Sequence, residues 1–279
     1  MMRVAAIQMN SGPEVPANLA RMRELVGQAA DAGARLVVLP ENMALMPSSQ
    51  ESRVHAAEAQ GQGPIQDALA EAAVRHQVWL VGGTIPLRVD GEPDRVAPAL
   101  LVYSPSGEMV ARYDKIHLFD VEVPGDSRRQ YRESDDFVPG QALRWVQVDD
   151  VCVGLSVCYD LRFPELYRAL VDHGAQVLVA PSAFTAQTGR AHWELLLRAR
   201  AVENLAFMIG ANQTGVHPRG HQTWGHSQIV DPWGRVLAAA ETLPGFVLAD
   251  LDLEQQRATR TRFPALTHRR LSADRIEDA

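Results

Sequence analysis

The chain has 279 residues, of which 46% are hydrophobic and 22% charged, a balance typical of one large globular domain or two small ones. Its formal net charge is −7, and the longest basic cluster covers only residues 268–270, so we expect no nucleic-acid partner. Apolar runs all fall short of the roughly 18 residues of a membrane span, so we also expect no membrane partner.

The apolar segments are short, and Pro, Gly or Asp bounds them. The first segment suits a strand better than a signal peptide. Most segments contain Val, Ile or an aromatic residue, which favours strands. The predicted strands are, in chain order, Val4–Met9, Leu36–Leu39, Val78–Ile85, Leu100–Tyr103, Val151–Val157, Val177–Ala180, Ala206–Ala211 and Phe246–Leu251.

Helical patterns lie between several of these strands, where apolar residues recur at i, i+3 and i+4. Two such sets are Leu19, Met22, Leu25, Val26 and Ala29, and Leu195, Ala199, Val202 and Leu205. The alternation of strands and helices predicts a layered α/β architecture.

Two parts of the chain resemble each other. Residues 31–40 read Asp-Ala-Gly-Ala-Arg-Leu-Val-Val-Leu-Pro, and residues 172–181 read Asp-His-Gly-Ala-Gln-Val-Leu-Val-Ala-Pro. A strand and then a hairpin with a Pro-x-Gly turn follow in each part. One such match can arise by chance, but three elements in the same order favour two similar halves packed sheet to sheet. We therefore expect one domain over residues 1–270, a four-layer α-β-β-α sandwich, followed by a C-terminal tail over 271–279.

The segment Val151–Cys158 has bulky apolar residues at its odd positions and small residues at its even positions. A strand with this pattern has one broad face and one slim face, and the slim face suits close approach of another layer. The two cysteines of the chain, Cys152 and Cys158, would lie about 20 Å apart along such a strand. Since a disulfide needs less than about 7 Å, we expect two free thiols, which favours a reducing cytoplasm.

Cys158 stands where this strand ends, and Pro164 suits the first turn of a following helix. A strand, a tight turn and a helix would lift a nucleophile out of the sheet and aim backbone N–H groups at the reacting atom. The alternative is that Cys158 is a small buried hydrophobic residue, the interpretation that fits Cys152.

Glu41 and Lys115 are two further candidates for chemistry. Glu41 directly follows a predicted strand, at the end where α/β proteins place their sites, and desolvation there would make it a usable base. Alternation along the next candidate segment places Tyr113, Lys115 and His117 on one face. The alternatives are a solvated acid at a strand end and an edge lysine in a salt bridge.

These segments together resemble the nitrilase superfamily of carbon–nitrogen hydrolases. The motifs are Leu-Pro-Glu at 39–41, Asp-Lys-Ile-His-Leu-Phe-Asp at 114–120 and Cys-Tyr-Asp-Leu-Arg-Phe-Pro-Glu at 158–165. Further likeness lies at 131–134, 189–203 and 225–234, so the resemblance covers about residues 4–270. It is similar to the Nit branch, which includes deaminated glutathione amidase and ω-amidase.

The resemblance implies a four-layer αββα sandwich and a Glu–Lys–Cys triad formed by Glu41, Lys115 and Cys158. A second glutamate of the family falls on Glu133. The donors to the oxyanion would be Lys115 and the backbone N–H of Tyr159. The implied reaction is attack of the thiol on an amide carbonyl, with Glu41 moving protons and Glu133 orienting Lys115 or the substrate.

The resemblance also places substrate-pocket positions at Arg162, Phe184 and Thr188. Arg162 would hold a substrate carboxylate through a two-pronged contact, or it would form a structural pair with Glu165 or Asp160. Phe184 and Thr188 would line the pocket or serve only in loop packing. The segments 120–140 and 214–223 are expected to shape the pocket.

We expect a cytoplasmic thiol amidohydrolase without a cofactor, a homodimer as in the family. It would cleave a primary amide of a small carboxylate-bearing substrate, such as deaminated glutathione or an α-keto-acid ω-amide, to acid and ammonia through a cysteine thioester. The alternatives are another amidase or a carbamoylase of the superfamily, a metal-dependent hydrolase, and a non-catalytic partner protein. His217, His221 and His226 could serve a metal, but their spacing matches no standard site and we expect no metal.

Overall fold

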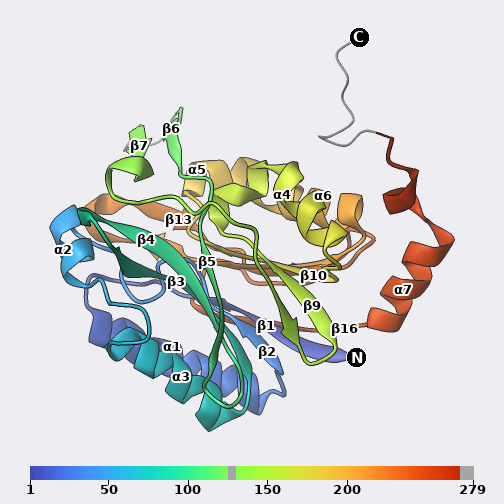
Figure 1. The fold of residues 1–279 in the computed structure, drawn as a ribbon, viewed down its shortest axis with the longest axis horizontal. Helices are drawn as coiled ribbons and strands as arrows, with labels where there is room; N and C mark the ends of the chain where they lie inside the picture. Colours follow the sequence, from blue (N-terminus) through green and yellow to red (C-terminus); the bar gives the residue numbers. More distant parts are fainter. Residues whose placement is uncertain (125–129, 271–279) are drawn as a thin grey trace.

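Two six-stranded β-sheets pack face to face in this computed structural model, and helices cover the outer side of each sheet (Figure 1). These helix–sheet–sheet–helix layers confirm the predicted α/β sandwich. The structure describes residues 1–124 and 130–270, so the predicted tail 271–279 and part of the loop 120–140 lie outside the described residues. The division into a domain over 1–270 and a tail stays a prediction. Within the described ranges, no helix is long and apolar enough to span a bilayer.

The first sheet carries most of the N-terminal half. Its strands, in spatial order, are β16 (Gly245–Leu251), β1 (Met2–Gln8), β2 (Leu36–Val38), β3 (Trp79–Val89), β4 (Glu92–Tyr103) and β5 (Met109–Asp114). The three strands β1, β2 and β3 are parallel, and antiparallel strands flank them on both sides.

The second sheet repeats this arrangement. Its strands, in spatial order, are β15 (Val236–Ala239), β14 (Gln228–Val230), β11 (Phe207–Asn212), β10 (Val177–Ser182), β9 (Val151–Leu155) and β8 (Trp145–Val148). Here β9, β10 and β11 are parallel, and antiparallel strands again flank them. The two stretches that resemble each other in sequence lead into β2 and β10, at equivalent places, which confirms the two similar halves.

Helices α1 (Val15–Asp31) and α3 (Pro64–His76) cover the first sheet, and α4 (Pro164–Asp172) and α6 (Glu194–Asn204) cover the second (Figure 1). The remaining helices are α2 (Gln50–His55), α5 (Ala186–Thr188) and α7 (Leu253–Arg262). Short helical turns are η1 (Glu133–Asp135), η2 (Cys158–Arg162), η3 (Gly189–Trp193), η4 (Pro218–Gly220) and η5 (Ala265–His268). Two small hairpins pair β6 (Asp120–Glu122) with β7 (Gln130–Arg132), and β12 (Thr214–Val216) with β13 (Gln222–Trp224).

The apolar pattern of α1 is its buried face, as predicted. In α6 the helix is confirmed, but two residues of the predicted apolar stripe, Leu195 and Val202, are 65% and 47% exposed. The buried face carries Leu197 together with Arg200 and Asn204. Arg200 is satisfied on that face because its Nε donates to the carbonyl of Leu161, so the buried face carries a polar side chain at a position outside the predicted apolar stripe.

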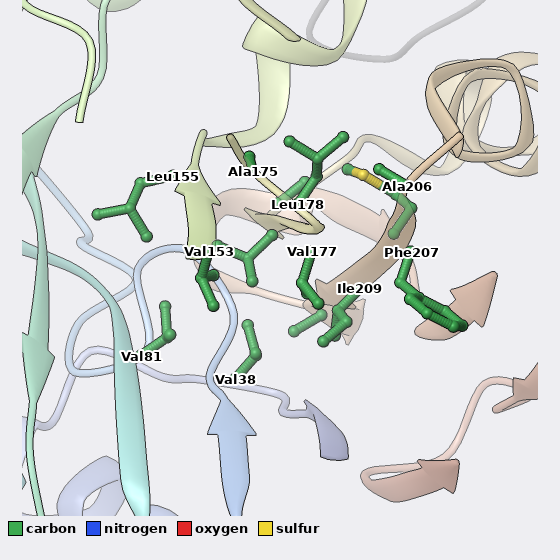
Figure 2. Packing of buried hydrophobic residues seen from close by; sticks show 14 of the residues in the cluster. Val38, Val81, Val153, Leu155, Ala175, Val177, Leu178, Ala206, Phe207 and Ile209 are labelled. Carbon is green, nitrogen blue, oxygen red and sulfur yellow. The ribbon is translucent and has the colours of Figure 1, made fainter. Parts of the chain in front are cut away.

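The broad face of β9 packs into the interface between the two sheets. Figure 2 shows Val153 and Leu155 of β9 on the side of Val38 and Val81, which belong to the first sheet. The slim face lies against the helical layer, because a Cβ at Gly154 would stand only 3.1 Å from atoms of Leu170 in α4. Both predictions from the alternating pattern of this strand are confirmed.

A bulge in β3 sets the path of the chain after β2. The register of β3 against β4 shifts between Val81 and Thr84, and Gly83 there has a φ of +65°. A Cβ at Gly83 would lie 2.0 Å from the carbonyl oxygen of Pro40, so only glycine allows this approach. Thr84 then accepts a hydrogen bond from the backbone N–H of Asn42, at 2.9 Å. The bulge therefore fixes Pro40 and Asn42, the two residues on either side of Glu41.

We predict that Gly83→Ala destabilises the protein more than Gly91→Ala. Both glycines have positive φ, so both substitutions carry a left-handed backbone cost of about 1–2 kcal/mol. Gly91 has open space around its Cβ position, whereas Gly83 meets the backbone of Pro40, which adds about 1–3 kcal/mol of overpacking. Urea unfolding of both variants measures the difference in the free energy of unfolding. Equal losses would contradict the steric role of Gly83.

Candidate functional site

Three polar side chains meet where strands from both sheets end. Glu41 follows β2, Lys115 is the first residue after β5, and Cys158 follows β9 at the start of η2. Glu41 and Cys158 line a cavity of about 460 Å³ at this edge. The structure therefore brings together the three residues that the sequence singled out.

Lys115 is fully buried and lies between two carboxylates. Its Nζ is 2.9 Å from Oε1 of Glu41, and 2.8 Å and 3.1 Å from the two oxygens of Glu133. Glu133 Oε2 also accepts a hydrogen bond from the backbone N–H of Phe119 at 2.8 Å, which orients that carboxylate. A buried ammonium between two acids is held tightly, because losing either partner would leave a charge uncompensated.

The charges of this cluster shift one another's ionisation. Burial raises the pKa of the Glu41 carboxyl above its ordinary value; Lys115 opposes this shift, and Glu133 adds to it. Burial alone would lower the pKa of Lys115, but Glu133 and Glu41 outweigh it and raise that pKa well above its ordinary value. Lys115 is therefore a permanent cation at neutral pH, and Glu41 is a stronger base than an ordinary glutamate.

The Cys158 thiol is a poor acid in this setting. Burial, and after it the negative charge of Glu41, raises the pKa of the thiol well above its ordinary value. The thiol is therefore protonated at neutral pH. A reaction that uses the thiolate needs a base beside it, and the carboxylate of Glu41 lies in the same cluster.

The backbone at Cys158 is strained. Its φ is +49°, in the left-handed region that residues with a Cβ rarely adopt. The turn from β9 into η2 imposes this conformation, and α4 begins at Pro164 directly afterwards. The predicted arrangement of strand, tight turn and helix is confirmed. A side chain on such a bend stands out from the sheet, and Cys158 remains 9% exposed at the cavity.

Asp160 joins the segment of Lys115 to the segment of Cys158. This fully buried carboxylate accepts hydrogen bonds from Tyr113 Oη at 2.7 Å and from the backbone N–H of Val157 at 2.8 Å, and its Oδ1 lies 2.7 Å from His117 Nδ1. Tyr113 and His117 thus turn toward Asp160, whereas Lys115 between them turns to the two glutamates. The expectation of one shared face fails because β5 ends at Asp114.

A second polar network supports Glu41 from behind. Gln213 Nε2 donates to the backbone carbonyl of Glu41 at 3.0 Å and to Ser11 Oγ at 2.8 Å. His217 Nδ1 lies 2.9 Å from the carbonyl oxygen of Ser11, and its Nε2 lies 2.7 Å from Thr223 Oγ1. The sequence did not reveal this role, because Ser11 and Gln213 lie 202 positions apart in the chain.

The three histidines of the segment 217–226 have separate surroundings. His217 belongs to the network behind Glu41, His221 lines the cavity, and His226 stacks on Trp224 with ring centroids 4.3 Å apart. Across residues 1–124 and 130–270, no group of His, Cys, Asp or Glu is arranged to hold a metal ion.

The predicted substrate-binding residues all line the cavity. Arg162, Phe184 and Thr188 stand on its wall together with Tyr159. The lining also includes Arg53, whose guanidinium lies 4.1 Å from the ring centroid of Phe137. The sequence did not reveal these lining residues, because α2 and its surroundings carry none of the motifs that pointed to the other segments.

Arg162 has a partner that the sequence did not suggest. Among the residues that the structure describes, its hydrogen bond is neither to Asp160 nor to Glu165 but to His192, with Nη2 at 3.1 Å from Nδ1. The guanidinium carbon lies 5.8 Å and 5.9 Å from the ring centroids of Tyr159 and Phe184, respectively. The alternative of a structural ion pair for Arg162 is therefore wrong.

Comparisons with family models, with known sequences and with solved structures all point to the same family. The model of the family "Carbon-nitrogen hydrolase" matches residues 3–261. The deaminated glutathione amidase of Yersinia enterocolitica is 39% identical over 267 residues, covering 96% of this chain and 92% of that protein. The omega-amidase NIT2 of Danio rerio is 35% identical over 268 residues, covering 96% and 94%.

A solved structure of the C. elegans NitFhit protein has the same fold. It superposes with a TM-score of 0.89 and is 33% identical, and the match covers 96% of this chain and 65% of that one. Three findings agree on one family. The family model spans nearly the whole chain, the relatives are more than a third identical, and the sandwich fold is shared. This chain belongs to the carbon-nitrogen hydrolase family, the nitrilase superfamily, and its enzymes hydrolyse carbon–nitrogen bonds.

Proposed function

We propose that this protein is a thiol amidase in which Glu41, Lys115 and Cys158 carry the reaction. The observation that supports this proposal most directly is the cluster at the cavity edge. A protonated thiol, a carboxylate with a raised pKa and a permanent ammonium stand together there, with Lys115 Nζ 2.9 Å from Glu41. These groups are what attack on an amide carbonyl needs: a nucleophile, a base and a fixed positive charge.

The first half of the proposed reaction forms a thioester. Sγ of Cys158 attacks the amide carbon while its proton passes to Glu41. The carbonyl oxygen becomes an oxyanion, stabilised by Lys115 Nζ and the backbone N–H of Tyr159. The carbon–nitrogen bond then breaks, and Glu41 returns the proton to the departing nitrogen. Removal of one such donor to an oxyanion lowers the rate about 10²- to 10³-fold in enzymes of this kind.

The second half releases the acid. Glu41 accepts a proton from water, and the resulting hydroxide attacks the thioester carbonyl. The carbon–sulfur bond breaks and the Cys158 thiolate takes the proton back, so the enzyme returns to its starting state. Glu133 touches Lys115 and the backbone of Phe119, which supports a role in holding Lys115 in place over a role in proton transfer.

The substrate class follows from the charge on the cavity wall. Arg162 lines the cavity with Cys158 and has no acidic partner among the described residues, so it suits a carboxylate on the acyl part of the substrate. We propose a small amide with such a carboxylate: an α-keto-acid ω-amide, which releases ammonia, or deaminated glutathione. The cavity of about 460 Å³ is of the size that small-molecule sites have, and Phe184 adds an apolar wall.

The thiol mechanism predicts that Cys158→Ala abolishes hydrolysis, because no other group of the cluster can form the thioester. Cys152→Ala is the matched control, since Cys152 is the other free thiol and lies on β9 away from the cavity. The panel comprises α-ketoglutaramate, deaminated glutathione, a neutral aliphatic amide and an aliphatic nitrile, and the acid product is measured. Undiminished hydrolysis in Cys158→Ala would overturn the assignment, and hydrolysis of the neutral amide alone would overturn the substrate class.

The raised pKa of Glu41 predicts that kcat/KM begins to fall at a higher pH, on the acidic side of the profile, than an ordinary glutamate would cause. Glu41 must be ionised to accept the thiol proton, so kcat/KM falls as pH drops through its pKa. Because that pKa is raised, the fall occurs above about 4.3, where an ordinary glutamate titrates. The measurement is kcat/KM between pH 4 and 8, with circular dichroism at each pH to exclude unfolding. A profile that stays flat to pH 4.3 would show that Glu41 is not the base.

We also propose that the protein is a homodimer joined through the outer face of α6. Leu195 and Val202 lie seven residues apart on one face of α6 and are 65% and 47% exposed. Trp233 is 62% exposed, and Val202 packs against Gly234 beside it, so exposed apolar side chains lie close together here, at a cost in water. Leu195→Glu should convert the dimer to a monomer in light scattering. Leu243→Glu, at another residue that is 77% exposed, is the control and should leave the dimer intact. A monomeric wild-type protein would contradict the proposal.

A further inference from the structure

The positive charge of Arg162 is held in place by a partner that does not cancel it. A guanidinium can only donate hydrogen bonds, so Nδ1 of His192 must accept this one through its lone pair. Burial, and after it the charge of Arg162, lowers the pKa of His192, which keeps the ring neutral. Arg112 shows the contrast, because its guanidinium forms two contacts of 2.8 Å and 2.9 Å with Asp114 that neutralise it.

His192 itself does not line the cavity. It lies in η3, a π-helical turn between α5 and α6, and such turns are uncommon and frequent at functional sites. The turn is anchored by the next residue, because Trp193 is fully buried and its Nε1 donates to the carbonyl oxygen of His226 at 2.7 Å. The backbone at His192 is therefore held by the packing of its neighbour Trp193, while the half-buried His192 ring contacts Arg162.

The rings of Tyr159 and Phe184 border the guanidinium on the cavity side of this contact. With one Nη bound to His192, the other donors of the fork remain free to meet a carboxylate in a two-pronged contact. A rigid, charged and uncompensated guanidinium binds an anion better than a flexible one, because less side-chain freedom is lost on binding.

We propose that His192 is a positioning residue, which holds Arg162 charged and directed into the cavity and thereby sets the preference for amides that carry a carboxylate. This inference rests on the proposed function and adds the residue that determines its substrate class. It concerns substrate recognition alone, because His192 touches neither the cavity nor the cluster of Glu41, Lys115 and Cys158.

Three substitutions separate the acceptor, the charge and the shape of residue 192. His192→Asn keeps an acceptor, since Oδ1 of asparagine occupies the place of Nδ1. His192→Leu fills the space without an acceptor. His192→Asp holds the guanidinium but cancels its charge. His268→Leu, in the exposed turn η5, is the control for handling of a histidine variant.

The readout is the ratio of kcat/KM for α-ketoglutaramate to that for a neutral amide of the same length. We expect His192→Asn to retain the wild-type ratio, and His192→Leu to lower it about ten- to a hundredfold, the range for loss of one hydrogen bond made by a charged group, chiefly through KM. We expect His192→Asp to lower it as well. Equal ratios in the Asn and Asp variants, or equal losses on both substrates, would overturn the proposal. If the Leu variant fails to fold, the difference in this ratio between the Asn and Asp variants still tests the proposal.

A binding measurement separates this inference from the proposed function. The acid product 2-oxoglutarate is titrated calorimetrically into the Cys158→Ala variant, with and without His192→Leu. Weaker binding in the double variant supports the positioning role whatever the wild-type turnover is, and unchanged binding overturns it. A wild-type protein that binds 2-oxoglutarate through this pair but hydrolyses no amide would contradict the proposed function alone.

Discussion

The buried ion cluster of Lys115 with Glu41 and Glu133 is the constraint on which the rest of the site depends. An ammonium without water around it is stable only if its acidic partners are fixed, and here each acid has its own support. The bulge at Gly83 and the amide of Gln213 fix the segment of Glu41, and the backbone of Phe119 fixes Glu133. The fold therefore serves the site by placing the ends of strands from both sheets around one charge.

Much of the fold was predictable from the sequence, because its signals are local. Short Val- and Ile-rich runs marked the strands, and the repeated stretch before β2 and β10 indicated two halves. The alternation of bulky and small residues along β9 also indicated one broad core face and one slim face that another layer approaches closely. The apolar stripe predicted for α6 did not match its buried face. Arg200 is buried there with a hydrogen bond to a backbone carbonyl, and no periodicity of apolar residues reveals such a bond.

The motifs located Glu41, Lys115 and Cys158, but the residues that support them were beyond a pattern analysis. Asp160 lies within one of those motifs, yet its partners Tyr113 and His117 are more than 40 positions away, so only the folded chain shows the connection. The contact between His192 and Arg162 is hidden from the sequence in the same way. His192 lies in a π-helical turn, whose residue spacing follows neither the α-helical nor the strand period.

The composition of the cluster has a consequence for how charge is handled during a reaction cycle. Two carboxylates paired with one ammonium, together with a neutral thiol, give the group a formal net charge of −1. Passing the thiol proton to Glu41 moves that charge but does not change it, and the same holds when an oxyanion forms and collapses. A site shielded from bulk water, and admitting only the one water that the second half consumes, would thus run the proposed cycle at constant net charge in the cluster, with no counter-ion entering or leaving.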